Sequence, residues 1–481
     1  MLLLICAELP VVAGAVLPLM KKGPSRLRVI WTVGIVWLTS ALAIALAFSG
    51  KAEMLRAFSG DEARSFALGL DQPGRLLLML IGVLCPPAVL FALEAMRDDP
   101  RRTAFFSWYL ISFGALILMA CAGNLLTLFL AFTVLAGLGL PLTGHTRDRD
   151  GFRAQRHYGR CVGIGWILAL TAVVGFSLAG LGAFRWGGLS MRGADEWEKV
   201  LCALAFLGFG ALAGVLPLSG WMAEMTLAPA PVSALLHAMA GSAGVFAVMR
   251  VLFYTVSPLD LKGTWLQMAL LALGVFTAVY SEIRMLRAGD VEMRLAWSSV
   301  GNYSFMLMGL ALLNAEGLTA AGSHLLSHGL AKMALFFCTG IILERTGRTH
   351  AEEMHGLGKL LPWTFTAFTV AGLSLMGVPP LPGFVSKYAL ITAAFMEGGA
   401  WQHMGAFVMA ASTVFTAADI LMVVFPAFCM SSSLREEEAL RDCGPQAKWA
   451  LGILCALLAA ASALAGPIMQ ELTKIGGGMG L

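Results

Sequence analysis

The stretch that decides the fold runs from Pro362 to Glu397 and reads PWTFTAFTVAGLSLMGVPPLPGFVSKYALITAAFME. It is long and apolar, and its middle is interrupted by the helix-breaking residues Gly377, Pro379, Pro380, Pro382 and Gly383. Proline removes a backbone donor and clashes with the preceding helical turn. In a bilayer, such a break is tolerated where it is buried in protein or lines a wet cavity. The stretch therefore predicts a broken membrane helix, with Lys387 directly after the break.

The composition of the whole chain agrees with a membrane protein. Hydrophobic residues make up 58% of the 481 residues and charged residues only 13%, whereas soluble globular chains carry roughly 25% charged residues. The apolar runs are continuous rather than alternating, which favours helices over a β-barrel. The net charge of +4 gives no footprint for nucleic acid. The nine cysteines form no C-x-x-C pair, so we predict no zinc or iron–sulfur site and no cofactor.

Hydropathy predicts an all-α polytopic membrane protein with about fourteen membrane-spanning segments. The predicted spans are 2–20, 29–49, 76–96, 104–122, 124–143, 160–183, 200–227, 231–256, 264–284, 295–314, 318–343, 362–397, 404–430 and 447–470. The seventh span, 200–227, is broken like the twelfth, because it contains Gly214, Pro217 and Gly220. Paired broken helices in two halves indicate an inverted-repeat transporter with its site near the breaks. The alternative is that Pro and Gly are simply common in membrane helices.

The loop charges predict the orientation. Lys and Arg concentrate in the odd-numbered loops, as in the cluster between Arg147 and Arg160. Positive loops stay cytoplasmic, so we expect both termini on the outer side of a bacterial or archaeal cytoplasmic (inner) membrane. The N-terminus has no basic region before its first apolar run, which favours a first membrane helix over a cleaved signal peptide.

Ionisable residues inside the spans are the candidate functional residues, because each costs at least about 2.5 kcal/mol to insert. Lys332 and Lys387 are the only lysines deep in apolar runs, and we find no arginine there. His324, His328 and Lys332 are spaced i, i+4 and i+8, which places them on one helix face. Because His exchanges protons near neutral pH, the row predicts a proton relay.

Other interpretations of these residues stay open. Either histidine could be neutral and bonded to a backbone carbonyl, and a haem would need a ligand from a facing helix, for which His237 is the other deep histidine. Asp419 lies inside the thirteenth span, where it could take part in proton transfer or pair with a nearby Lys or hydroxyl.

Three motifs in order carry a resemblance to a known family. They are Leu216-Pro217-Leu218 with Trp221 and PAPVSALLH at 229–237, His324-Leu325-Leu326-Ser327-His328 with Lys332, and GVPPLPGFVSK at 377–387. Asp71 and Asn124 also fall where the family has similar residues. The chain resembles the antiporter-like membrane subunits shared by respiratory complex I (NADH:quinone oxidoreductase), Mrp-type cation/proton antiporters and energy-converting membrane-bound hydrogenases.

The resemblance implies a fourteen-helix fold with two inverted five-helix repeats, helices 4–8 and 9–13. The implied division is 1–103 for the first three helices, 104–257 and 258–430 for the two repeats, and 431–481 for the last helix. It also implies a proton pathway through Lys387, Lys332, His328, His324, His237, Glu224 and Asp419. The chain ends soon after its last span, so we do not expect the long lateral helix that one branch of the family appends.

The first repeat departs from the family pattern. A buried Glu is expected at Thr133, and buried lysines are expected at Leu212 and Ser242. Losing the whole set leaves no charge unpaired, so the three losses are mutually consistent.

Two functions follow from this mixture. One is a proton- or cation/proton-translocating subunit of a redox-driven complex, with other antiporter-like subunits and a peripheral electron-transfer arm as partners. The other is a structural membrane anchor of such a complex that does not pump. Nothing in the sequence resembles a catalytic centre, and the sequence does not distinguish H⁺ from Na⁺ or K⁺.

Overall fold

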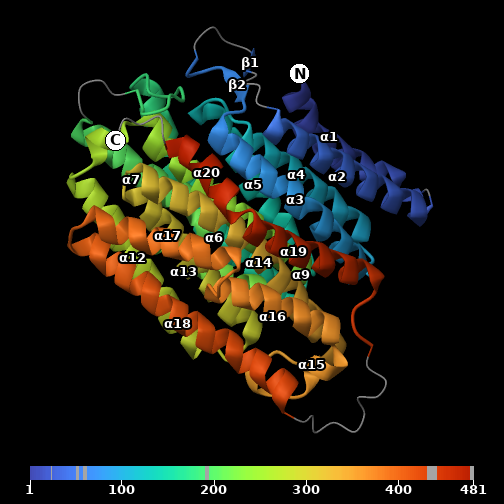
Figure 1. The fold of residues 1–481 in the computed structure, drawn as a ribbon. Helices are drawn as coiled ribbons and strands as arrows, with labels where there is room; N and C mark the ends of the chain where they lie inside the picture. Colours follow the sequence, from blue (N-terminus) through green and yellow to red (C-terminus); the bar gives the residue numbers. More distant parts are fainter. Residues whose placement is uncertain (23, 50–53, 58–61, 190–193, 431–440, 477–481) are drawn as a thin grey trace.

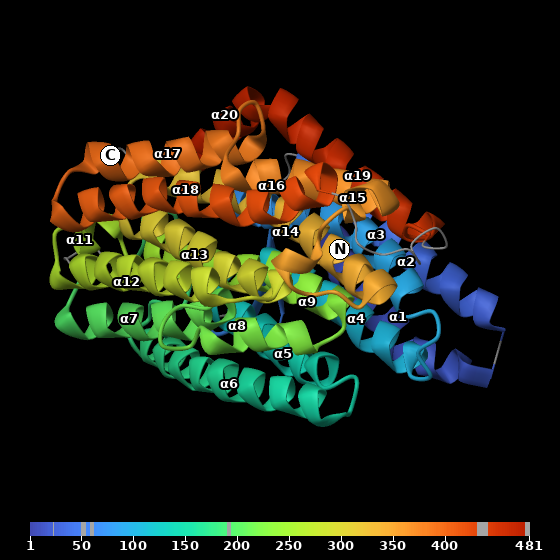
Figure 2. The same cartoon turned by 90° about the horizontal axis from the view of Figure 1, so that it is seen from below.

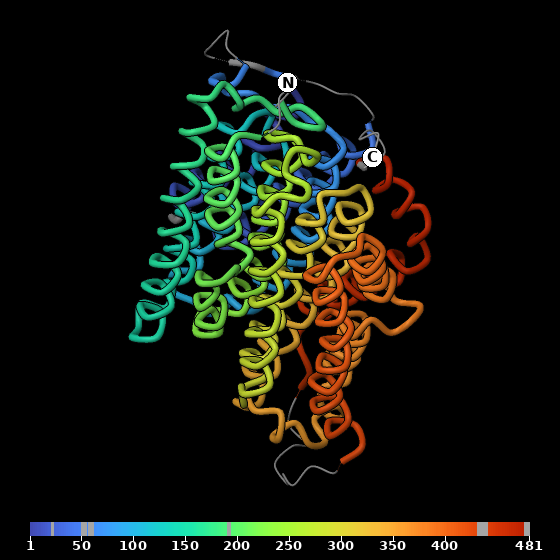
Figure 3. The backbone as a smooth tube through the Cα atoms, turned by 90° about the vertical axis from the view of Figure 1, so that its left-hand side faces the viewer, coloured from blue at the N-terminus to red at the C-terminus, as the bar shows by residue number. Residues whose placement is uncertain are grey.

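The computed structural model describes residues 1–22, 24–49, 54–57, 62–189, 194–430 and 441–476. These residues form a bundle of long helices that run roughly along one direction (Figures 1 and 3). Within this part, eleven helices are long and apolar enough to cross a membrane. The predicted polytopic helical membrane protein is therefore confirmed, while the total of fourteen spans stays a prediction.

The eleven segments overlap predicted spans, although α6 begins at Arg149, within the stretch that was predicted to be a loop before the span 160–183. Their bounds are α1 Leu2–Val16 with the 3-10 turn η1 Leu17–Lys22, α2 Ser25–Phe48, α3 Gln72–Ala95, α4 Arg102–Ala120, α5 Leu125–Thr143, α6 Arg149–Leu178, the segment Ala230–Thr255, α12 Trp265–Arg287, α14 Ala315–Thr346, α18 Ala400–Cys429 and α19 Pro445–Ala463. The segment Ala230–Thr255 is built from α9 Ala230–Leu235, the π-helical turn η4 Leu236–Ala240, α10 Gly241–Arg250 and the π-helical turn η5 Val251–Thr255.

The three remaining predicted spans are α13 and the two broken segments. α13 runs over Val291–Ala311. The seventh span consists of α7 Glu196–Gly210, η2 Ala211–Ala213, α8 Gly220–Glu224 and η3 Met225–Leu227. The twelfth consists of α16 Pro362–Met376 and α17 Pro382–Glu397. Both predicted breaks are therefore present.

Glycines make both breaks possible. Gly214 ends η2 with φ +71° and Gly377 ends α16 with φ +83°, a left-handed conformation that side chains other than glycine rarely adopt. After the second break, α17 returns so close to α16 that a Cβ on Gly383 would lie 1.8 Å from the Ser374 carbonyl oxygen. Because the side chain of Gly383 is a single hydrogen, the start of α17, and with it Lys387, can lie against α16.

Two features were not predicted. Strands β1 Met54–Ala57 and β2 Phe66–Gly69 form an antiparallel hairpin outside the bundle, so the all-α description has one small exception. The last predicted span, 447–470, is also wrong as a single helix, because α19 ends at Ala463 and the separate helix α20 Ala465–Gly476 follows. Short helices α11 Pro258–Leu261, η6 Ala351–Glu353 and α15 Leu357–Leu360 lie in loops.

The helices are ordered across the bundle. α6 lies at one edge, α12 and α13 lie in the middle, and α17 to α20 lie toward the opposite edge (Figures 2 and 3). α14 is one of the most enclosed elements, since its most apolar stretch is 94% buried and that of the segment Ala230–Thr255 is 100% buried, against 28% for α19. α1 begins and α20 ends toward the same end of the bundle (Figure 3). Residues 431–440, where the last predicted boundary falls, lie outside the described residues.

Candidate functional site

The predicted row of ionisable residues lies on α14, a long helix that is enclosed by its neighbours over most of its length. His324, His328 and Lys332 are each exposed by 1% or less. The helix is fixed at its start by Asn314, whose side chain accepts a hydrogen bond of 2.7 Å from the Gly317 backbone N–H. Because the three residues are one turn apart, they follow each other along the inner face of one rigid element.

His324 ties three helices together. Its Nε2 lies 3.0 Å from Asn302 Oδ1 on α13, and its Nδ1 lies 2.9 Å from Ser386 Oγ on α17. An amide oxygen only accepts, so Nε2 donates to Asn302 and Nδ1 accepts from Ser386 in the neutral ring. Both ring nitrogens are occupied, so this histidine has no free nitrogen to bind a haem iron.

Lys387 directly follows Ser386, which contacts His324. Ser386 Oγ also lies 2.9 Å from Ser327 Oγ, which in turn donates to the His324 carbonyl. The Lys387 side chain is buried, yet its Nζ has no hydrogen-bond partner among the described residues. A buried ammonium group left without partners is costly, so the surroundings of Nζ must be hydrated or polar when the lysine is charged.

His328 and Lys332 continue the row toward the other end of α14. Lys332 Nζ donates to the Leu295 carbonyl on α13 at 2.7 Å. Neither ring nitrogen of His328 has a partner in the described part of the chain. The ring centroids of His324 and His328 are 6.1 Å apart. The row thus alternates between groups held by the protein and groups with free hydrogen-bonding capacity.

Tyr303 connects this row to the first half of the chain. Its ring centroid is 4.7 Å from that of His328, and its hydroxyl donates to the His237 carbonyl. The same hydroxyl lies 3.5 Å from Ser242 Oγ. Sequence reasoning missed Tyr303, although a tyrosine in an apolar run is a signal, because a buried Tyr usually needs a partner for its hydroxyl.

His237 lies beside the first break, within a π-helical turn. Its Nε2 is 3.2 Å from the Met222 carbonyl on α8, and its ring stacks on Phe336 of α14 with centroids 4.4 Å apart. This histidine therefore lies at the junction of both halves, close to the α14 row.

The structure does not bring Glu224 into the row. Its carboxylate is held by Arg153 Nε at 2.8 Å and lies 3.7 Å from His157 Nδ1, both on α6. The Arg153 side chain is 64% exposed, so the pair lies near the surface of the bundle. Although Glu224 and His237 are close in sequence, no hydrogen bond or ion pair among the described residues joins their side chains.

Two buried arginines were not among the predicted site residues. Arg294 of α13 is buried and pairs with Asp419 of α18. Asp419 therefore has an arginine partner rather than the expected Lys or hydroxyl. Arg250 is 1% exposed and pairs with Asp71 before α3, with its NH2 2.6 Å from Asp71 Oδ1. Both arginines lie near the ends of apolar runs. The sequence does not show which distant helix buries each of them.

A buried carboxylate near the Arg294–Asp419 pair was also missed. Glu282 of α12 is 7% exposed and accepts a hydrogen bond from Ser412 of α18 through one carboxylate oxygen. Its second oxygen has no partner among the described residues. Glu282 lies near the charged end of α12, which is why hydropathy alone assigned it to a boundary.

The three positions that lack the family charges are neutral and satisfied. Thr133 Oγ1 donates to the Phe129 carbonyl at 2.8 Å and accepts from Trp166 Nε1 at 2.8 Å. Ser242 Oγ donates to the Ala238 carbonyl at 2.8 Å. Leu212 is fully buried in η2. A Cβ added to Gly244 would lie only 3.0 Å from the Cβ of Leu212. The packing at Leu212 is close and apolar.

Comparisons with known proteins agree with this geometry. The chain is 28% identical over 424 residues to NADH-quinone oxidoreductase subunit N of Desulforudis audaxviator, covering 84% of this chain and 82% of that protein. It is 28% identical over 439 residues to hydrogenase-4 component B of Escherichia coli, covering 85% of this chain but only 64% of that longer protein.

Solved structures show the same fold. A chain of the membrane-bound sulfane sulfur reductase (MBS), an archaeal respiratory membrane complex, superposes with a TM-score of 0.86 at 24% identity, covering 99% of this chain and 97% of that one. A chain of respiratory complex I from Thermus thermophilus superposes with a TM-score of 0.84 at 21% identity, covering 100% and 99%.

The profile of one family matches residues 122–416, which include both breaks and the whole α14 row. This match covers more than half of the chain. The chain belongs to the NADH:quinone oxidoreductase/Mrp antiporter transmembrane family.

Proposed function

We propose that this chain is a proton-translocating membrane subunit of a multisubunit, redox-driven complex of the complex I, Mrp or membrane-bound hydrogenase type. The observation that supports it best is the buried row of His324, His328, Lys332 and Lys387. Two of these four residues, His328 and Lys387, keep buried nitrogens without partners among the described residues. A purely structural anchor would gain nothing from retaining such groups, because each costs free energy that a hydrocarbon side chain avoids.

The row can move protons because its members have different roles. Lys387 and His328 have free capacity to bind water or accept a proton, whereas Lys332 is held by a backbone carbonyl. Histidine accepts and releases protons in the physiological range. A proton thus passes between Lys387 and Lys332 along His324 and His328 through short chains of water and the hydroxyls of Ser386 and Ser327.

The first half does not conduct in this proposal. Leu212 is apolar and tightly packed, and a hydrophobic constriction tends to dewet and close. The hydroxyls of Thr133 and Ser242 are already bonded to carbonyls of their own helices. Protons that reach Lys387 therefore communicate with a neighbouring subunit rather than crossing this chain alone.

The assembly and location follow the same proposal. The relatives are named as a subunit and a component of larger assemblies, so we infer further antiporter-like subunits and a peripheral electron-transfer arm as partners. We place the chain in a bacterial or archaeal inner membrane with both termini outside, as the loop charges predict. We divide it into repeats at 104–257 and 258–430, as the family resemblance implies.

The test is proton transfer by the intact complex in sealed vesicles. Lys387→Ala and His328→Ala should abolish proton uptake coupled to electron transfer, whereas Thr133→Ala and Leu212→Ala should leave the coupling at the level of the unmodified complex. Assembly of each variant is checked by co-purification of the partner subunits. Normal coupling in an assembled Lys387→Ala complex would refute the proposal and leave the anchor role.

A further inference from the structure

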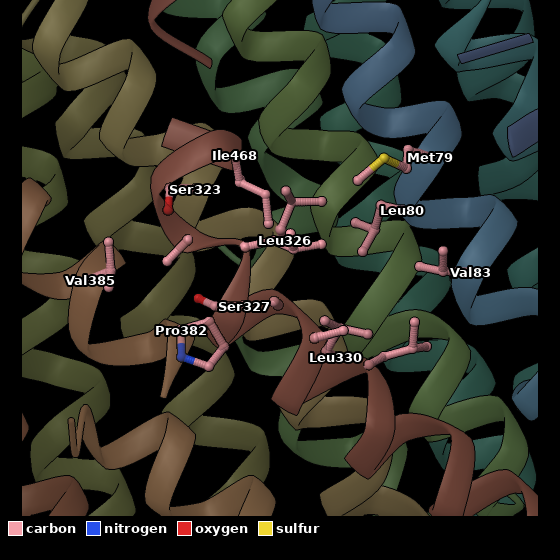
Figure 4. A pocket seen from close by; sticks show the side chains of 15 residues that line it. Met79, Leu80, Val83, Ser323, Leu326, Ser327, Leu330, Pro382, Val385 and Ile468 are labelled. Carbon is pink, nitrogen blue, oxygen red and sulfur yellow. The ribbon is translucent and has the colours of Figure 1, made fainter. Parts of the chain in front are cut away.

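Two adjoining cavities lie along α3, α14 and α20. The smaller is also lined by α17 and α19, and the larger by the end of α2. The smaller has a volume of about 150 Å³ and the larger about 500 Å³. They share four lining residues: Met79, Leu326, Leu464 and Ile468. Figure 4 shows the smaller cavity, into which Leu80, Val83, Leu330 and Ile468 project. The two cavities meet at the four shared residues, and each is many times larger than the roughly 10–15 Å³ that a site for one water needs.

The space runs along α3 from its first turn inward. Gln72 and Arg75 line the larger cavity at the start of the helix, Met79 lines both, and Leu80 and Val83 line only the smaller one. At 1.5 Å per residue, Val83 lies about 12 Å further along the helix than Arg75. The polar mouth is thus at the helix end, and the apolar part is at membrane depth.

The mouth carries a cation, the guanidinium of Arg75. Arg75 Nε is buried and has no hydrogen-bond partner among the described residues. Glu471, the acidic residue at the same mouth, is bonded to Lys474 of its own helix α20. A buried guanidinium nitrogen needs an acceptor, and its planar fork suits a phosphate.

We propose that these cavities hold one phospholipid, with its phosphate at Arg75 and one acyl chain in the apolar space. Below the mouth, the smaller cavity is lined by hydrocarbon apart from Ser323 and Ser327. The Ser327 hydroxyl is already used, because it donates to the His324 carbonyl and its oxygen lies 2.9 Å from Ser386 Oγ. A hydrocarbon chain satisfies such a wall, whereas a polar ligand would find few groups to bind.

The position gives the lipid a role. Ser327 belongs both to the cavity wall and to the hydrogen-bond cluster of His324 and Ser386. The acyl chain therefore covers this cluster with hydrocarbon on the side of α3 and α19. The proposed lipid-binding site does not depend on the proposed proton transfer, so lipid binding is tested separately from coupling.

The experiment measures phospholipid retained by the whole complex after extensive washing in mild detergent, by mass spectrometry of the extracted lipid. Arg75→Gln removes the charge, and Ala461→Phe fills the smaller cavity from α19. The matched controls are Arg185→Gln, an exposed arginine in a loop, and Ala459→Phe, an exposed position on α19 that does not line either cavity. We expect retention to fall several-fold in both test variants and to stay unchanged in both controls.

Three results would overturn the proposal. One is equal retention in the unmodified complex and in both test variants. Another is recovery of a prenylquinone instead of a phospholipid as the molecule lost from the variants. The third is a map of the assembled complex that shows a helix of a partner subunit in the cavities. Because Ala461→Phe and Ala459→Phe differ only in the direction of the added ring, misfolding by a bulky residue in α19 would affect both alike.

Discussion

At the scale of single residues, the buried charges fall into two groups. Arg294 and Asp419 form a closed buried ion pair between α13 and α18, and the buried Arg250 pairs with Asp71, whose side chain is 41% exposed at the start of α3. Lys387 has no such partner among the described residues. Closed pairs hold helices together, whereas an open buried charge stays available to exchange protons with water.

The Arg294–Asp419 pair gives a prediction about stability. Arg294→Met leaves a buried carboxylate alone and should destabilise the protein by about 3–5 kcal/mol, while the double change with Asp419→Leu should recover most of the loss. The measurement is the thermal unfolding temperature of the purified complex, with the exposed Arg287→Met as the control. If the double variant is no more stable than Arg294→Met, the pair does not act as a closed unit.

At the scale of elements, the broken helices decide where the functional side chains lie. A straight helix over 362–397 would carry Lys387 past α14, whereas the turn between α16 and α17 sets Ser386 against His324. The turn depends on Gly377, with positive φ, and on Gly383, which packs against the carbonyl of Ser374.

We predict that Gly383→Ala prevents this turn. A methyl group would lie 1.8 Å from a backbone oxygen, and no flexible side chain can move to relieve it. The amount of assembled complex in the membrane should fall strongly, as measured by immunoblotting of purified membranes. Gly34→Ala is the matched control, because nothing lies within 4 Å of its added Cβ and alanine favours a helix by up to about 1 kcal/mol. Normal assembly of the Gly383→Ala protein would contradict the close packing described.

At the scale of the whole molecule, the two halves differ in what they bury. The second half contributes Lys387, Lys332, His328, His324, Glu282 and the Arg294–Asp419 pair. Near its own break, the first half contributes His237, while Glu224 points to the surface. The halves meet at Tyr303, whose hydroxyl contacts the first half and whose ring contacts His328.

This asymmetry predicts an uneven distribution of water. In a high-resolution map of the assembled complex, ordered waters should cluster around His328, Lys332 and Lys387 and should be absent around Leu212. A continuous water chain past Leu212 would contradict the closed first half, and a dry second half would support the anchor role instead.

A second prediction at this scale concerns partners. We expect the chain purified alone to be less stable than the same chain within its complex, because surfaces made for neighbouring subunits would be exposed to detergent. Size-exclusion chromatography in mild detergent checks this. A monodisperse, transport-competent monomer would argue strongly against a subunit role.

The sequence alone determined the membrane class, the approximate spans, both breaks and the α14 row. These follow from hydropathy, from proline and glycine, and from helical spacing, all of which act within about twenty residues along the chain. The family resemblance also rests on such local motifs, and the match over residues 122–416 confirms it.

Only the tertiary structure decided what each side chain meets. Asn302, Ser386 and Tyr303 around the histidines, Arg294 opposite Asp419, and the distance of Glu224 from the row could not be read from spacing. Each of these contacts joins helices that are separate in sequence, and hydropathy reports how apolar a helix is but not which neighbour it faces. For the same reason, the sequence did not predict that α20 is separate from α19. α20 packs against α3 and α14.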